Sequence, residues 1–97
     1  MATMTDAEIL AAVKNGMGIT HDFQDKTLEL YIADVKAFML DAGVKESVLS
    51  DSAAVGCILR GVIDLWNYGS GGVGFSDYFS KRVIQLAAGG GSNDATN

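Results

Sequence analysis

Apolar residues recur at helical spacing through most of the chain, and the clearest period lies between about Asp25 and Ala42. An apolar residue falls there at every third or fourth position, which places a wide apolar stripe along one face of a helix. Charged residues occupy the other side, and Gly43 follows directly. The segment is therefore predicted to be an amphipathic helix with a stripe made of Leu28, Tyr31, Ile32, Val35, Phe38, Met39 and Ala42.

A shorter helix is predicted ahead of it, beginning at the sequence TDAE. These residues form a capping box, in which the Thr5 hydroxyl accepts from the Glu8 amide and the Glu8 carboxylate reaches back. A left-handed residue at Asn15 and Gly16 is expected to end the helix. Its apolar face consists of Ile9, Leu10 and Val13.

The second half of the chain predicts a buried central helix. Asp51 or Ser52 can cap it, and the run from Ala53 to Trp66 is apolar almost all round. Gly56 and Gly61 each lower its stability by about 1 kcal/mol relative to alanine. We expect the close approach of another helix to compensate at both glycines. Residues 44–50 before it are a connector with room for one helical turn.

Two charged residues interrupt this apolar run. Arg60 and Asp64 are four positions apart, so they can pair on the strip that meets solvent or a neighbouring subunit. The run is also too short to span a bilayer. We therefore expect no membrane association.

The last predicted helix begins at Ser76, which can cap it, and runs to about Ala88. Residues 89–97 are a glycine-rich polar tail with nothing to bury, so they are expected to be disordered or ordered only by a partner. The fold prediction is all-α, a small bundle of about four helices in one domain, residues 1–88. The inner stripe of the last helix is Phe75, Phe79, Val83 and Leu86.

A glycine-rich loop separates the last two helices and is a candidate contact with a neighbouring subunit. It resembles a phosphate-binding loop only superficially, because it follows a helix rather than a strand and no lysine comes before Lys81. Nucleotide binding is therefore not expected. The loop consists of Gly69, Ser70, Gly71, Gly72, Val73, Gly74 and Phe75.

The chain offers few residues for catalysis or metal binding. His21 with Asp22 and Asp25 has the donor types of a metal site. A lone histidine in a loop is more often a polar residue that separates two helices, and Asp22 or Asp25 is then expected to cap the next helix. Cys57 lies in the most apolar helix, far in sequence from the histidine, and is expected to be a buried, inert thiol. We expect no cofactor, no metal and no enzymatic activity.

The charge balance argues against a protein that grips nucleic acid. Twelve acidic and seven basic residues give a net charge of −5, and the basic residues are scattered. A helix-turn-helix reader is disfavoured as well, since the would-be recognition helix carries a single arginine. The lone cysteine and an N-terminus without a signal-peptide pattern predict folding in a reducing cytoplasm.

The order of these segments resembles the head–tail connector proteins of long-tailed bacteriophages, the small helical adaptors beneath the portal ring. The resemblance spans roughly Ile19 to Ala87. It rests on the histidine-acid stretch and long helix HDFQDKTLELYIADVKAFMLDAGV, the apolar helix CILRGVIDLWNYG that ends in an aromatic residue, the glycine loop, and the final FSDYFSKRVIQLA.

The resemblance implies a ring of about twelve identical subunits that docks on the portal protein and extends the DNA channel. DNA would pass through without specific binding, and the next neck or tail-completion protein would dock below. The location implied is the neck of the virion, with the host cytoplasm during assembly. The glycine loop would face the channel or a neighbour. Candidate portal-docking residues are Lys81, Arg82, Gln85, Gly89, Gly90, Gly91, Ser92 and Asn93.

One alternative from a different class stays open on the sequence alone. A small, acidic, helical chain also fits a regulator that acts as a dimer on a protein partner. The two readings differ in assembly, because a connector closes into a ring of many subunits whereas a regulator stops at two.

Overall fold

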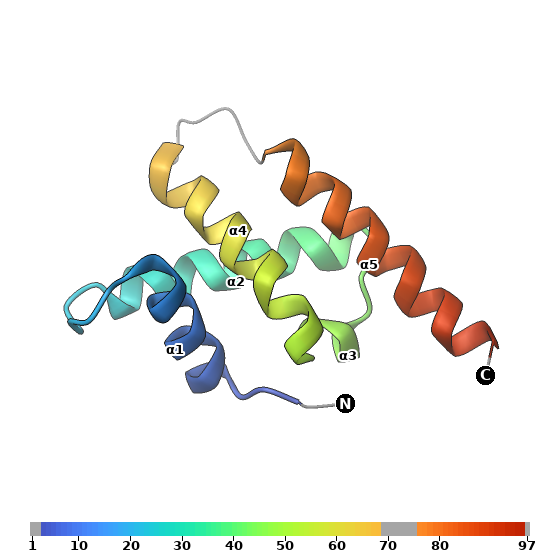
Figure 1. Ribbon diagram of the computed structural model, residues 1–97, viewed down its shortest axis with the longest axis horizontal. Coiled ribbons are helices and arrows are strands. Elements are labelled where there is room, and N and C mark those ends of the chain that lie inside the picture. Colours follow the sequence, from blue (N-terminus) through green and yellow to red (C-terminus); the bar gives the residue numbers. More distant parts are fainter. Residues whose placement is uncertain (1–2, 69–75, 97) are drawn as a thin grey trace.

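The computed structural model describes residues 3–68 and 76–96. Within these residues the chain forms five helices and no strand, which confirms the all-α prediction (Figure 1). Four helices correspond to those expected, and the fifth is a single turn inside the 44–50 connector. The helices are α1 (Asp6–Met17), α2 (Asp25–Asp41), α3 (Glu46–Leu49), α4 (Ser52–Tyr68) and α5 (Asp77–Thr96).

The helices form a flat body. Its principal extents are 44 × 29 × 17 Å, and Figure 1, viewed along the shortest axis, shows α4 crossing in front of α2. α1 packs against both of these helices, whereas α5 rests mainly on α4. Because α2 and α4 pack against each other, the outward sides of these two helices point away from the core in opposite directions.

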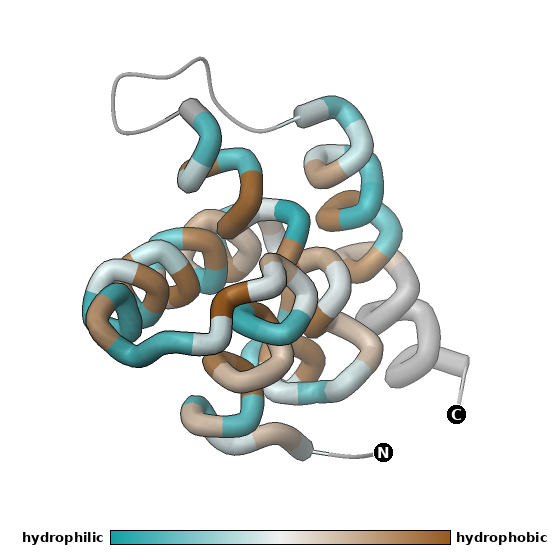
Figure 2. Tube along the Cα trace, turned by 60° about the vertical axis from the view of Figure 1, so that its left-hand side comes forward, coloured by the Kyte–Doolittle hydropathy of each residue, from teal (hydrophilic) through white to brown (hydrophobic). Residues whose placement is uncertain are grey.

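One apolar core joins every helix, and α4 lies at its centre as expected. Figure 2 shows apolar positions alternating with polar ones along the packed helices. The buried apolar residues are Ile9, Val13, Leu28, Ile32, Val35, Met39, Val44, Leu49, Ala54, Cys57, Ile58, Val62, Phe79, Val83 and Leu86.

The predicted caps of α1 and α4 are present. The Glu8 amide donates to the Thr5 hydroxyl at 3.1 Å, and the Thr5 amide donates to the Glu8 carboxylate at 2.8 Å. At α4 the cap is Asp51, whose carboxylate accepts from the Ala53 amide at 2.9 Å. Ser76 caps α5, since its hydroxyl accepts from the Phe79 amide at 3.3 Å.

The predicted end of α1 at Gly16 is wrong. The helix continues to Met17, and the left-handed residue is Gly18, with φ of 74°. Gly16 serves packing instead, because a Cβ there would lie 2.5 Å from Leu59 Cδ2. The absence of a side chain at Gly16 lets α1 approach α4 closely.

The two glycines of α4 lie in opposite environments, so the expected compensation is found at only one of them. Gly61 is buried, and a Cβ there would lie 2.7 Å from Phe79 Cε1 and 2.9 Å from both γ carbons of Val35. Gly56 is exposed, and a Cβ there would meet nothing within 4 Å. Within the described residues, close helix packing therefore explains Gly61 but not Gly56.

α5 extends beyond its predicted end. The inner stripe residues Phe79, Val83 and Leu86 are buried as expected, and Phe75 lies outside the described residues. The backbone of α5 continues to Thr96 rather than ending near Ala88. Lengthening a helix adds a hydrogen bond with each residue, and the chain has no proline to stop it. The predicted boundary at Ala88 is not confirmed, and the disorder of residues 89–97 stays a prediction.

Candidate functional site

The glycine loop, residues 69–75, lies outside the described residues, but the start of α5 after it is held by one buried group. The carboxylate of Asp64, on α4, is 6% exposed and accepts from the Ser76 amide at 3.0 Å. A buried carboxylate needs such a donor, since an unpaired buried acceptor is costly. Asp64 therefore ties the first turn of α5 to α4.

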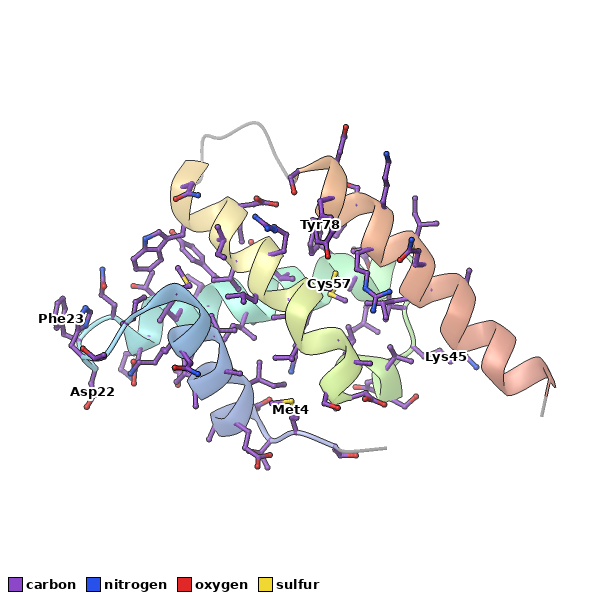
Figure 3. All side chains as sticks on the ribbon, viewed as in Figure 1. Met4, Asp22, Phe23, Lys45, Cys57 and Tyr78 are labelled. Carbon is purple, nitrogen blue, oxygen red and sulfur yellow. The ribbon has the colours of Figure 1, made fainter. Side chains whose placement is uncertain are left out.

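The predicted ion pair between Arg60 and Asp64 is not formed, because the two side chains point to different places. Asp64 turns inward to Ser76, whereas Arg60 is exposed with its Cζ 5.4 Å from the centroid of the Tyr78 ring. A guanidinium over an aromatic face is a favourable cation–π contact. Figure 3 shows Tyr78 between α4 and α5, so the Arg60–Tyr78 contact bridges the two helices at the surface.

The candidate portal-docking residues all lie on α5, and the structure divides them. Lys81 and Gln85 are exposed, whereas Arg82 is half-buried and donates from Nη1 to Gln85 Oε1 at 3.1 Å. The remaining five contribute helical backbone to the far part of α5. They are Gly89, Gly90, Gly91, Ser92 and Asn93.

An apolar stripe on the outward side of α2 was missed by the sequence analysis. It consists of Leu30, Ala33, Ala37 and Leu40, and we call it the outer α2 face. Leu30 is 67% exposed and Leu40 is 46% exposed. The spacing of three, four and three residues is itself a helical period, so a search for a second stripe on the same helix would have found it.

The histidine-acid stretch forms a charged cluster around a lysine instead of a helix cap. Lys14 Nζ lies 2.8 Å from Asp25 Oδ1 and 3.3 Å from Asp22 Oδ1. Because both carboxylates are directed to this ammonium, neither caps α2, whose N-cap Gln24 makes no side-chain cap bond. The expected aspartate cap is therefore wrong.

The same cluster changes the ionisation of its lysine. The hydrogen bond that the Lys14 ammonium donates to Asp25, helped by the nearby Asp22 carboxylate, raises the pKa of Lys14. Folding thus favours the charged ammonium, and this contribution is present at neutral pH and is lost as the pH rises through the raised pKa. Among the described residues, no group of three histidine, cysteine or acidic side chains is placed to hold a metal.

The tip of the α1–α2 connection carries an aromatic pair. The rings of His21 and Phe23 stack with centroids 3.8 Å apart, and Phe23 is 82% exposed. Figure 3 shows Phe23 and Asp22 at the far end of the molecule from α5.

A cleft of about 570 Å³ runs between α1 and α2, and its lining residues include Lys36 and Asp6, which form an ion pair at 3.4 Å. The residues lining this cleft include no nucleophile paired with a base.

Cys57 is buried, as expected, and faces from α4 toward α5 (Figure 3). Removal from water raises the pKa of its thiol to about 11, an effect that the positive charge of Arg82 partly offsets. Since the thiolate is the reactive form, a raised pKa and burial both make this thiol inert.

This inertness is testable. At pH 8 we expect the folded chain to react with a thiol reagent such as a dinitrobenzoate disulfide at least about 100-fold more slowly than the unfolded chain. The comparison uses the same protein with and without guanidinium, followed by absorbance. A folded rate within about tenfold of the unfolded rate would contradict the buried placement of Cys57.

Comparison of the chain with protein-family models, with curated proteins and with solved structures found no match. Among the described residues, no helix is both long and apolar enough to span a membrane.

Proposed function

We propose that this chain is a structural adaptor of a bacteriophage neck. In this role, copies form a homo-oligomeric ring beneath the portal protein, extend the DNA channel and join the head to the next neck or tail-completion protein. The role is structural and requires no cofactor. The chain would reach the virion neck after assembly in the host cytoplasm.

The observation that carries the proposal is the order of segments along the chain. The resemblance to head–tail connectors rests on a long amphipathic helix, a connector, an apolar helix ending in aromatic residues, a loop and a last helix. The described residues have this order as α2, α3, α4 and α5. The apolar helix is also the central helix of the core, so the matched segments include the body of the domain and not only its surface.

The distribution of charge also supports an adaptor around a DNA channel. The chain carries a net charge of −5, so a ring of about twelve copies would be a strongly acidic collar. Phosphates are repelled by such a surface, and DNA would slide past it without adhering. The same negative charge would weaken binding in a protein that holds DNA.

Two surfaces are assigned within this proposal. The exposed Lys81 and Gln85, with Arg82 and the backbone of residues 89–93, would dock on the portal. The loop 69–75 would face the channel or a neighbouring subunit. The hydrogen bond from the Ser76 amide to the Asp64 carboxylate supports the assignment of the loop, because it would anchor the residue directly after the loop to α4.

The proposal is tested by native mass spectrometry of the purified chain over a wide concentration range, alone and mixed with a portal ring, with negative-stain images of large species. We expect rings of about twelve copies, or rings that form only on the portal. Removing residues 89–97 is expected to abolish portal binding while the remaining chain stays folded. A stable dimer that never grows, in both samples, would instead identify the chain as the dimeric regulator.

A further inference from the structure

Two outward helix faces of this molecule carry unlike charge and similar spacing. The outer α2 face has Asp34 and Asp41 along one edge, Glu29 along the other, and Lys26 toward its start, a local charge of −2. The outward side of α4 consists of Ala53, Gly56, Arg60 and Asn67, and we call it the outer α4 face. Its only charged residue is Arg60.

The two faces lie on opposite sides of the flat body. Val35 of α2 and Gly61 of α4 meet in the core, so the sides of these helices away from that contact point in opposite directions. The molecule is only 17 Å across its shortest axis. A second copy could therefore stack against each broad side, with Tyr78 of α5 beside Arg60 at the edge of the outer α4 face.

We propose that the outer α2 face of one copy packs on the outer α4 face of the next copy. The inference rests on the proposed ring, and it names the contact that would build it. Because the two faces differ, the contact is head-to-tail, the kind of interface that generates a ring when the rotation closes. Each copy presents its outer α2 face to one neighbour and its outer α4 face to the other.

Packing favours this pairing. The α2 stripe repeats at three, four and three residues, and the outward residues of α4 repeat at three, four and seven, so both helices present the row spacing that interlocks when helices cross at a small angle. Leu30 and Leu40 project from the first face, whereas Gly56 and Ala53 leave the second face shallow. Both helices are 17 residues long, so the stripes match in length.

Charge favours the same pairing. Arg60 lies at the middle of the length of α4, and Asp34 lies near the middle of the length of α2, on one edge of the outer α2 face. Stacking the faces centre on centre brings these two side chains together whichever way the helices run. Pairing α2 with a second α2 would instead bring together two faces that each carry a charge of −2, and pairing α4 with α4 would bring Arg60 against Arg60. Like-charge contacts of this kind are strongly unfavourable across an interface.

The test exchanges the charges of the two faces. One variant carries Asp34→Lys and Asp41→Lys, and the other carries Arg60→Glu. Either variant alone has two faces of the same sign, and we expect its self-association to be weaker than that of the wild type by about tenfold or more at low ionic strength. Sedimentation velocity and native mass spectrometry measure the association, and circular dichroism checks that each variant is folded.

Mixing the two variants gives the decisive result. In a 1:1 mixture every contact again joins opposite charges, so we expect assembly to return with the two variants alternating. Glu46→Lys, an acid-to-lysine exchange on α3 and outside both faces, serves as the control and should assemble like the wild type. Only a head-to-tail contact between these two faces predicts rescue by mixing.

The remaining outcomes separate the two proposals. Wild-type rings with variants that assemble normally would overturn the face pairing and leave the ring standing. A mixture that stays unassembled while the wild type forms rings would also overturn the pairing alone. A wild type that stays monomeric both by itself and with a portal ring would overturn the ring and the pairing together.

Discussion

Replacing Phe79 with alanine is expected to lower the free energy of unfolding by about 3–5 kcal/mol. The Phe79 side chain is fully buried between α5 and α4, with the Phe38 ring at a centroid distance of 5.7 Å. Its ring edge rests against Gly61, which has no side chain to fill the space that the truncation leaves. The truncation therefore costs both the apolar burial of the ring and a cavity. Urea or guanidinium unfolding followed by circular dichroism measures the loss.

The neighbouring Tyr78 provides the control for this experiment. It is an aromatic residue one position earlier on the same helix, but its side chain is 63% exposed. Tyr78→Ala is expected to lower the free energy of unfolding by no more than about 1 kcal/mol, because it removes only the exposed contact with Arg60. Equal effects of the two substitutions would mean that α5 does not pack on α4 through Phe79.

The same substitution at the two glycines of α4 is expected to have opposite effects. Gly61→Ala should lower the free energy of unfolding by about 1–3 kcal/mol, because the added methyl group overlaps the Phe79 ring and the Val35 side chain and forces both to move. Gly56→Ala should raise it by about 0.5–1 kcal/mol, because alanine favours the helix and the site is open. Equilibrium unfolding of the two variants and the wild type gives both values.

This pair carries its own control, since each variant changes one glycine of one helix in the same way. The intrinsic preference of alanine for a helix contributes equally to both, so the difference between them isolates packing. A stabilising Gly61→Ala would show that α2, α4 and α5 are not in close contact at this point.

Features that depend on a few neighbouring residues could be predicted from the sequence. The capping box at Thr5 and Glu8 needs only two residues that are three positions apart. The N-terminal caps at Asp51 and Ser76 need only backbone amides of the helical turn that follows. The main stripe of α2 repeats over its whole length and predicted the helix correctly, although Phe38 is 40% exposed and the exposed Ala42 follows the last residue of α2. These local signals sufficed for the all-α class and for the order of the helices.

Features that depend on contacts between distant segments could not be predicted. Gly16 has the same local pattern as a helix end, but it lies within α1 against Leu59, and the left-handed residue is Gly18. Gly56 and Gly61 look alike in the sequence, yet one is exposed and the other lies against Phe79. The spacing of Arg60 and Asp64 permits an ion pair, but the position of Ser76 gives the carboxylate a buried donor instead.

The same difference between local features and long-range contacts applies to the candidate surfaces. The sequence identified the basic residues of α5, because charge is visible in any sequence. It did not reveal the outer α2 face, since Leu30 and Leu40 read as part of a generally apolar helix until the core side of that helix is known. Which leucines are exposed is a property of the packing of α2 on α4.

The attachment of α5 has a mechanical consequence for any assembly of this chain. α5 rests mainly on α4, through one apolar stripe, the Ser76–Asp64 hydrogen bond and the Arg60–Tyr78 contact, and residues 69–75 connect the two helices in the sequence. The α4 of a second copy offers the same partners, so an exchange of the last helices between two copies, which is domain swapping, would keep each of those contacts. In a swapped assembly, a pulling force would be carried by the covalent backbone that connects α4 to α5. The subunits would separate only after α5 came off the α4 of its partner copy.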